Sequence, residues 1–155
     1  TTLGPLGVRR SVLVTTTLPL SRPMADLGCE LLTYAQAEAG AQAAQVSVIA
    51  FVQTWFGPSQ MAVRQLMAAA PSLGVETFFV DADKEAHRAH QLGIWGAPAF
   101  LFFARGAQLT VQRPEADDAN KYVGSISMDE LDSLLRQARE CVTSGVSVLC
   151  AGAHK

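Results

Sequence analysis

A near-continuous apolar run, Val46–Val52, restricts the choice of fold more than any other segment of the chain. A run of this length without polar alternation is expected for a strand that is covered on both of its faces. Gly57 and Pro58 follow shortly after it, and such a pair ends a strand and suits the first turn of a helix. The segment therefore indicates an α/β protein in which a central sheet lies between two layers of helices.

Strands and helices alternate along the rest of the chain. Further strands are predicted at residues 11–17, 75–80, 99–103 and 108–112, where β-branched and aromatic side chains gather. Helices are predicted from residue 23 to about 39, between residues 58 and 71, over residues 84–92 and after residue 127. The resulting order is β-α-β-α-β-α-β-β-α, a mixed sheet whose last two strands form an antiparallel hairpin around Arg105 and Gly106.

Single residues are expected to start, end and pack these helices. Gly40 allows the first helix to stop or bend, and Asp83 is the predicted N-cap of the third. Ser127 and Glu130 are typical of a capping box at the start of the last helix. Core positions are expected for Met61, Leu66, Met67 and Met128.

The length of 155 residues fits one domain, which we place at residues 11–143, with an extension at 1–10 and a tail at 144–155. Hydrophobic residues make up 49% and charged residues 17%, so the chain is globular and its surface is either covered by neighbours or simply rich in alanine. A net charge of −2 without a Lys/Arg stripe gives no reason to expect nucleic acid as a direct partner. No stretch approaches the roughly 20 apolar residues that span a bilayer, so no transmembrane segment is expected.

The first 25 residues allow two interpretations. They contain Arg9, Arg10 and Arg22 and no acid, which is typical of part of an organellar transit peptide. Residues 11–17, Ser-Val-Leu-Val-Thr-Thr-Thr, are typical of an ordinary first strand, which we favour. The composition of the segment leads us to expect an organelle, foremost the mitochondrion, with the cytoplasm or cytoskeleton as the alternative.

The spacing of the cysteines and histidines favours neither a disulfide framework nor a metal site. The three cysteines, Cys29, Cys141 and Cys150, form no Cys-x-x-Cys pair, and their odd number argues against a secreted disulfide framework. His87 and His90 are three residues apart on a predicted helix, but a metal site needs three or four ligands and no other Cys or His lies nearby in sequence. We therefore expect no metal and no cofactor.

Three segments together resemble the thioredoxin family. Residues 48–59 end in Trp-Phe-Gly-Pro-Ser, where a thioredoxin carries Trp-Cys-Gly-Pro-Cys. Residues 80–83 and 92–103 resemble the approach to the third helix, the cis-proline loop and the fourth strand, and residues 122–124 resemble the lead into the final helix. The resemblance implies a thioredoxin fold over about residues 46–140, with a looser fit at 11–45.

The chain departs from this family at each position that carries its chemistry. By the resemblance, Phe56 stands where the attacking cysteine would be, and Ser59 stands where the resolving cysteine would be. Ala50 occupies the place of the buried acid that assists proton transfer, and the lysine that partners this acid would fall near Phe79. Attack on a disulfide needs a thiolate, so the resemblance implies no catalytic residue for dithiol exchange.

The resemblance also implies a contact surface beside the degenerate turn. The Ala97-Pro98 bond is expected to be cis, and its backbone offers an N–H and a C=O to an extended peptide in relatives. Large exposed apolar patches usually mark contact sites. Alternatively, Phe56 packs onto its own domain and plugs the groove. The surface comprises the turn (Trp55, Phe56, Gly57, Pro58 and Ser59) and the cis-proline loop (Trp95, Gly96, Ala97 and Pro98).

These observations lead us to expect a redox-inactive thioredoxin-like protein, not an enzyme, that serves as an accessory subunit of a larger protein assembly such as a respiratory complex or a mitoribosome. One alternative is a peptide-binding or chaperone-like module that uses the Pro98 groove, and another is an accessory protein of microtubule or axonemal complexes. A thiol-disulfide oxidoreductase that relies on Cys29, Cys141 or Cys150 fits the residues least, because none of them lies where the fold performs its chemistry.

Overall fold

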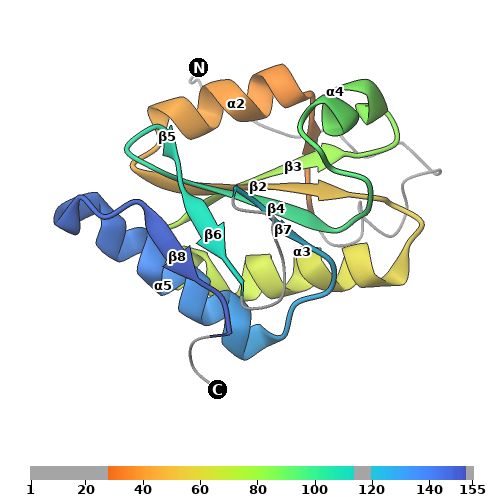
Figure 1. Ribbon diagram of the computed structural model, residues 1–155. Helices are drawn as coiled ribbons and strands as arrows, with labels where there is room; N and C mark the ends of the chain where they lie inside the picture. Colours follow the sequence, from red (N-terminus) through yellow and green to blue (C-terminus); the bar gives the residue numbers. More distant parts are fainter. Residues whose placement is uncertain (1–27, 114–119, 153–155) are drawn as a thin grey trace, which may run out of the picture.

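The computed structural model describes residues 28–113 and 120–152, and within these ranges a six-stranded mixed sheet forms the centre of the molecule (Figure 1). Its strand order is β1-β3-β2-β4-β5, and β7 pairs with the other end of β4. The elements are β1 (Leu31–Leu32), α2 (Tyr34–Ala43), β2 (Val46–Val52), α3 (Gly57–Ala69), the 3-10 turn η3 (Pro71–Leu73), β3 (Glu76–Asp81), α4 (Ala86–Gln91), β4 (Ala99–Ala104), β5 (Ala107–Gln108), β6 (Thr110–Gln112), β7 (Tyr122–Val123), α5 (Met128–Ser144) and β8 (Val148–Cys150).

Two layers of helices cover the sheet, with α2 and α4 on one face and α3 and α5 on the other (Figure 1). All seven residues of β2 are buried, as predicted for a strand covered on both sides. Ile49 and Phe51 pack with apolar residues of α2 and α4, whereas Val48, Ala50 and Val52 belong to the larger cluster that includes α3 and α5. The predicted α/β class and the mixed sheet between helices are confirmed, and the order of elements from α2 to β5 is the predicted one, with β1 at Leu31–Leu32 in front of it. The strand predicted at residues 108–112 is divided, because β5 pairs with β4 whereas β6 pairs with β8 in a second sheet, and β7 and β8 are additional short strands.

The register of the sheet brings three connecting segments to one edge. β2 and β3 are parallel, and their last pair joins Val52 to Asp81. β2 and β4 are antiparallel, and the pair nearest this edge joins Phe51 to Ala99. The segment after β2, the segment after β3 and the segment before β4 therefore leave the sheet at the same edge.

The first helix starts later and runs further than the sequence predicts. Leu31, expected on a helix face, lies in β1, which pairs parallel with Phe79 and Val80 of β3. Thr33 caps α2 through a reciprocal capping box with Gln36, so the helix begins only at Tyr34. The predicted first strand at residues 11–17 and the extension at 1–10 lie outside the described residues.

Gly40 was expected to stop or bend this helix, but α2 continues through it to Ala43. Packing explains why a glycine occupies this position inside the helix, because a Cβ at residue 40 would lie 2.5 Å from Cε1 of Phe78. The glycine is needed because the ring of Phe78 closely approaches the helix backbone, and the helix tolerates it there.

The methionines do not fill the core. Met61, Met67 and Met128 are all exposed, and α3 instead buries Leu66 together with small residues of the same face. The prediction of core positions for these methionines is therefore wrong: the buried face of α3 consists of Ser59, Ala62, Val63, Leu66 and Ala69, and Met128 is the exposed first residue of α5.

Two capping predictions have different outcomes. Asp83 does not cap α4, whose N-cap is Glu85; Asp81 Oδ1 accepts the backbone N–H groups of Asp83 and Lys84 instead. Ser127 caps α5 by accepting the backbone N–H of Glu130, as predicted. The Glu130 carboxylate accepts a hydrogen bond from the backbone N–H of Gly152 at 2.7 Å, 22 residues away.

The segment expected to form a tail after residue 143 contains a strand. β8 pairs parallel with β6, and Leu149 is fully buried. The amide of Gln137 on α5 donates to the carbonyl of Cys150 and accepts its N–H, so a side chain occupies the outer edge of this strand. For residues 148–151 the expected tail is therefore part of the folded domain.

No helix in the described part of the chain combines the length and the apolar character that crossing a membrane requires.

Candidate functional site

The turn between β2 and α3 is closed by hydrogen bonds within its own residues. The backbone N–H of Phe56 donates to the carbonyl of Gln53 at 3.0 Å, and the Gln60 side chain donates to the carbonyl of Thr54 at 2.8 Å. Ser59 is fully buried on α3, and its hydroxyl accepts the backbone N–H of Gln53 at 3.0 Å. The Ser59 oxygen therefore stabilises the turn from inside.

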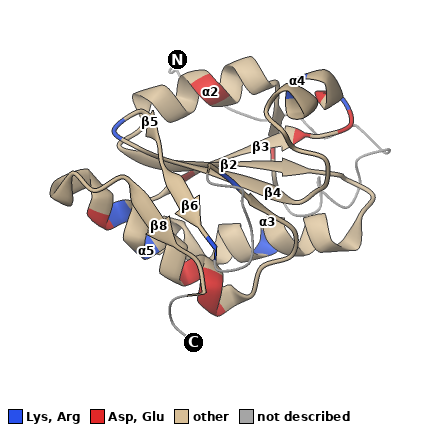
Figure 2. Cartoon of the chain, in the orientation of Figure 1, with Lys and Arg blue, Asp and Glu red and all other residues tan. Residues whose placement is uncertain are grey.

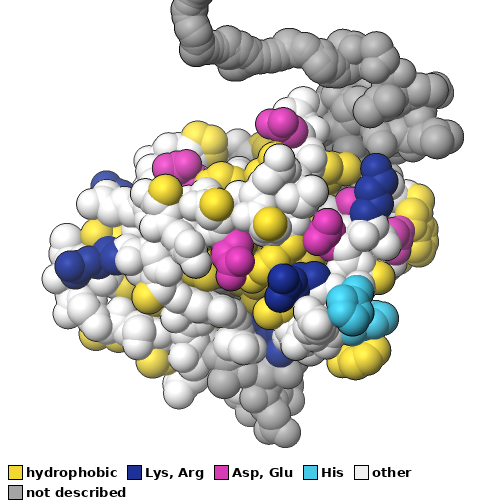
Figure 3. All heavy atoms as spheres, turned by 90° about the horizontal axis from the view of Figure 1, so that it is seen from above, with side chains coloured by type: hydrophobic (Ala, Val, Ile, Leu, Met, Phe, Trp, Pro, Cys, Tyr) yellow, Lys and Arg dark blue, Asp and Glu magenta, His cyan; other side chains and the backbone are white. Residues whose placement is uncertain are grey.

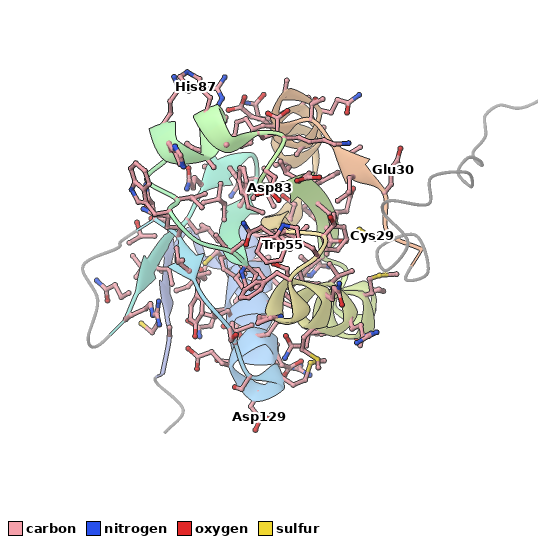
Figure 4. The ribbon with its side chains drawn as sticks, turned by 90° about the vertical axis from the view of Figure 1, so that its right-hand side faces the viewer. Cys29, Glu30, Trp55, Asp83, His87 and Asp129 are labelled. Atoms are coloured by element: carbon pink, nitrogen blue, oxygen red, sulfur yellow. The ribbon has the colours of Figure 1, made fainter. Side chains whose placement is uncertain are left out.

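Trp55 projects from this turn and is oriented by a carboxylate from the next connecting segment. Its indole Nε1–H donates to Asp83 Oδ2 at 2.8 Å, and the Gln53 side chain donates to Asp83 Oδ1 at 3.2 Å. Figure 4 shows Trp55 and Asp83 side by side. Although Trp55 is 66% exposed, these contacts restrict its ring before any partner arrives.

Trp95 is a second exposed aromatic side chain at the same edge. It is 77% exposed, and its ring stacks on His90 of α4 with a centroid distance of 4.3 Å and an interplanar angle of 20°. Figure 3 shows the histidines beside hydrophobic side chains at the rim of the face that α2 and α4 cover. Both tryptophans thus present most of their surface to solvent, while the hydrogen bond to Asp83 orients Trp55 and the stacking on His90 orients Trp95.

The loop before β4 has the predicted backbone. The Ala97-Pro98 peptide bond is cis, Pro98 is buried, and its carbonyl accepts the N–H of Gly124 at 2.8 Å. The register of β2 and β4 places this loop beside the turn that carries Phe56. Phe56 itself is half-buried, with its ring centroid 5.5 Å from that of Trp55.

Searches against family models and curated proteins give no match to this chain. Solved structures do match its fold. A point mutant of a thioredoxin from Halobacterium salinarum NRC-1 superimposes with a TM-score of 0.60 at 21% identity, over 72% of this chain and 89% of that one. The oxidised mitochondrial thioredoxin 3 of Saccharomyces cerevisiae gives 0.57 at 19% identity, over 71% and 95%. Chloroplastic thioredoxin z gives 0.57 at 19% identity, over 72% and 95%.

The chain adopts the thioredoxin fold. The match rests on the arrangement of the sheet and its helices, since the identities lie between 19% and 21% in these three structures. By the sequence resemblance described above, the turn at Trp55–Ser59 corresponds to the dithiol turn of thioredoxins. The loop at Trp95–Pro98 corresponds to their cis-proline loop.

An apolar pair occupies the place that the resemblance gives to the acid and lysine of thioredoxins. Ala50 and Phe79 are direct partners in the register of β2 and β3. Ala50 is fully buried and Phe79 nearly so. These two positions therefore offer no group that exchanges a proton near the turn.

The cysteines lie elsewhere in the thioredoxin fold. Burial, with a smaller effect of the neighbouring Glu30, raises the pKa of the Cys29 thiol to about 12. Burial, with a smaller effect of Glu140, also raises the pKa of Cys141. Cys150 is exposed on β8 and lies far along the chain from the turn. Since the thiolate is the reactive form, Cys29 and Cys141 are poor nucleophiles at neutral pH.

Metal ligation has no candidate in residues 28–113 and 120–152, where no group of three His, Cys, Asp or Glu side chains converges. His87 and His90 are exposed, and His87 contacts the side chain of Gln91 on its own helix.

Sequence reasoning identified both tryptophans but missed the residues that orient them. Asp83 was expected to cap its own helix, and its contact to Trp55 spans 28 residues. His90 was considered as a metal ligand, and its stacking on Trp95 depends on the turn after α4. The position of Asp83 could have indicated this contact. Asp83 follows a strand that is parallel to β2, so it lies at the same edge of the sheet as the turn after β2.

Proposed function

We propose that this thioredoxin-like protein does not exchange electrons and that it acts through contacts, as an accessory subunit of a larger protein assembly. The observation that carries the proposal is the chemistry of the turn, where Phe56 and Ser59 supply no thiol and Ser59 is fully buried with its hydroxyl bonded to Gln53. A disulfide is reduced through a mixed disulfide that needs a thiolate at this place.

The surface around the turn supports contact as the retained role. Two exposed tryptophans, Trp55 and Trp95, lie at one edge of the sheet, and each is oriented by a neighbouring side chain. Tryptophan is enriched among the residues that dominate binding energy at interfaces. Preorientation lowers the entropy that a partner must overcome when it immobilises these rings.

The outer helices also suit a covered surface. α2 and α3 lie on opposite faces of the sheet, and each contains one charged residue, Glu38 and Arg64 respectively. Figure 2 shows both helices almost entirely in the colour of uncharged residues, whereas α5 contains residues of both signs. Charged residues are depleted at the centre of interfaces, so neighbours in an assembly would fit over these two helices.

A disulfide-reduction assay tests the absence of electron transfer. The full chain is incubated with insulin and dithiothreitol, with an active thioredoxin as the positive control. We expect the rate with the chain to equal the rate with dithiothreitol alone. Catalytic turnover would contradict the proposal, and loss of that turnover in Cys29→Ser, Cys141→Ser or Cys150→Ser would identify the thiol responsible.

Substitution of the tryptophans tests the contact role. The tagged full chain is expressed in its source cells, and the stoichiometry of co-purified subunits is compared among Trp55→Ala, Trp95→Ala and the control Val146→Ala. Val146 is also exposed and apolar, but it lies beyond α5. We expect both tryptophan variants to lose partners at unchanged thermal stability while the control keeps them. Retention of all partners by both tryptophan variants would contradict the proposal.

Phe56→Ala separates the two interpretations of the half-buried Phe56 ring. If the ring belongs to the interface, the substitution weakens assembly more than the free energy of unfolding. If the ring plugs the groove, the substitution lowers stability and leaves partner affinity intact.

A peptide-binding or chaperone-like module is the second candidate, and the cis Ala97-Pro98 bond beside the turn favours it. Relatives offer backbone hydrogen bonds at this loop to extended peptides. Purification under dilute conditions separates the candidates: one set of partners at fixed stoichiometry supports the subunit, and weak binding to many unfolded clients supports the chaperone.

For the location we propose the mitochondrion, on the composition of residues 1–25, which contain arginines and no acid. Cell fractionation with a C-terminal tag tests it, and recovery with microtubules or axonemes would instead favour a cytoskeletal assembly.

A further inference from the structure

The carboxylate of Asp83 carries a charge that the described residues leave without a cation. Its Oδ2 accepts the indole N–H of Trp55 at 2.8 Å, and its Oδ1 accepts the side-chain amide of Gln53 at 3.2 Å, so both donors are neutral groups. Within residues 28–113 and 120–152 the structure gives Asp83 no ion pair. A carboxylate oxygen has two lone-pair sites, and each oxygen of Asp83 uses one of them for these bonds. Each oxygen therefore keeps an acceptor site for a further donor.

The ring of Trp55 lies beside this carboxylate and offers aromatic surface to a cation. The indole bonds Asp83 through its edge, so this hydrogen bond leaves both faces of the ring unused. The side chain is 66% exposed, and Phe56 lies against it with a centroid distance of 5.5 Å and an interplanar angle of 55°. Cations bind over the faces of aromatic rings, and tryptophan is the most favourable ring for this contact. An exposed indole with a carboxylate at its edge thus suits a positively charged group.

The charge of the neighbouring segments has the sign that attracts a cation. Residues 53–61, which comprise the turn and the start of α3, contain no charged side chain. The segment that ends β3 and leads to α4 contains three acids and one base, namely Asp81, Asp83, Glu85 and Lys84. Asp81 bonds backbone N–H groups at the end of its strand, whereas Asp83 is exposed to a partner. Complementary charge of this kind steers a cationic partner toward the surface.

Among cationic side chains, arginine fits the ring and the carboxylate together. Its planar guanidinium stacks on aromatic faces and presents a fork of N–H donors that matches two carboxylate oxygens, whereas lysine carries a compact, strongly hydrated charge. Arginine is also enriched, like tryptophan, among the residues that dominate binding energy at interfaces. We propose that a partner protein places an arginine side chain on the face of Trp55, with its guanidinium bonded to the Asp83 carboxylate. This inference rests on the proposed function, because it names the chemistry of the partner at the same surface.

Short peptides with blocked ends and a single arginine between glycines test this chemistry in the full chain. The matched controls carry lysine or citrulline instead, and citrulline keeps the shape of arginine without its charge. The NMR signal of the Trp55 indole N–H reports binding. We expect the arginine peptide to shift this signal with a dissociation constant about tenfold lower than that of the citrulline peptide, because it adds charge-assisted hydrogen bonds. Equal binding of the arginine peptide and either control, or no shift by any peptide, would overturn the inference.

Two acid-to-amide substitutions locate the arginine site. Asp83→Asn removes the charge but keeps an oxygen that accepts the Trp55 N–H. Asp129→Asn is the control, because Asp129 is also exposed and Figure 4 shows it at the lower end of the molecule, away from Trp55. We expect Asp83→Asn to abolish the preference for the arginine peptide and Asp129→Asn to retain it. Retention of the preference in both variants would overturn the inference.

Co-purification from the source cells separates this inference from the proposed function. If Trp55→Ala loses its partners while Asp83→Asn keeps them, the contact role stands and the arginine assignment is wrong. If Trp55→Ala and Trp95→Ala both keep all partners, the contact role is contradicted and this inference falls with it. Association of the chain with itself that Asp83→Asn abolishes, measured by sedimentation, would assign the site to a second copy and overturn the assignment to a different protein.

Discussion

Two fully buried serines differ in whether their hydroxyl has a partner. Ser59 accepts the backbone N–H of Gln53, whereas the Ser47 oxygen on β2 has no hydrogen-bond partner within the described residues. Loss of a buried hydrogen bond costs about 1 kcal/mol, and an unpaired buried hydroxyl also costs free energy. We expect Ser59→Ala to lower the free energy of unfolding by about 1–2 kcal/mol and Ser47→Ala to leave it equal or higher. Urea titrations measure both, and equal losses in the two variants would contradict the assignment.

Thiol reactivity is the second residue-level prediction. Cys150 is exposed, whereas burial raises the pKa of both Cys29 and Cys141. We expect iodoacetamide at pH 7.5 to modify Cys150 at least tenfold faster than the other two, as read by mass spectrometry. Because the Cys29 pKa is about 12, its thiolate fraction and its alkylation rate should rise about tenfold per pH unit from pH 7.5 to 9.5. A plateau of the Cys29 rate near pH 8 would contradict this.

At this scale, sequence reasoning found the exposed side chains but not the contacts that orient them. The Gly-Pro turn and its resemblance predicted that Trp55 and Trp95 share a surface, and the sheet register brings their segments to one edge. The partners Asp83 and His90 depend on tertiary geometry that local propensity does not encode.

At the scale of elements, Gly40 tests how α2 packs on the sheet. An exposed glycine inside a helix usually costs roughly 1 kcal/mol relative to alanine, so Gly40→Ala would normally stabilise. Here the added Cβ would lie 2.5 Å from the Phe78 ring. We expect Gly40→Ala to destabilise by about 1–2 kcal/mol in the native background and to stabilise when combined with Phe78→Ala. A double-mutant cycle by urea unfolding measures the coupling, and zero coupling would exclude the contact.

The misplaced start of α2 has a physical cause. Leu31 and Tyr34 fit a helical spacing, but a strand of two residues has too short a pattern to compete with that signal. The capping box at Thr33 and Gln36 was the local evidence for the true boundary. In contrast, the predictions of β2, α3 and β4 succeeded because these segments are long and strongly patterned. The two strands are buried on both faces, and the helix buries one apolar stripe.

The described molecule contains a second, small sheet in addition to the six-stranded one. β8 follows the last helix, α5, and forms a second, two-stranded sheet with β6. Side chains of α5 attach it: Gln137 bonds both backbone groups of Cys150, and Glu130 accepts the N–H of Gly152. The segment 148–151 alternates buried and exposed residues too briefly for sequence patterning to reveal it, and its partners lie far along the chain.

If β8 belongs to the cooperative core, its loss destabilises the whole domain. Leu149 is fully buried in the cluster with α5, whereas Val146, three residues earlier, is exposed. Leu149→Ala is expected to lower the free energy of unfolding by about 2–5 kcal/mol, because it leaves a cavity between β8 and α5. Val146→Ala, the matched control, should change it by less than about 0.5 kcal/mol. The decisive measurement follows unfolding by circular dichroism and by amide exchange of β2 together. A Leu149→Ala variant that frays β8 while β2 keeps its native protection would show that the strand is an appendage and not part of the core.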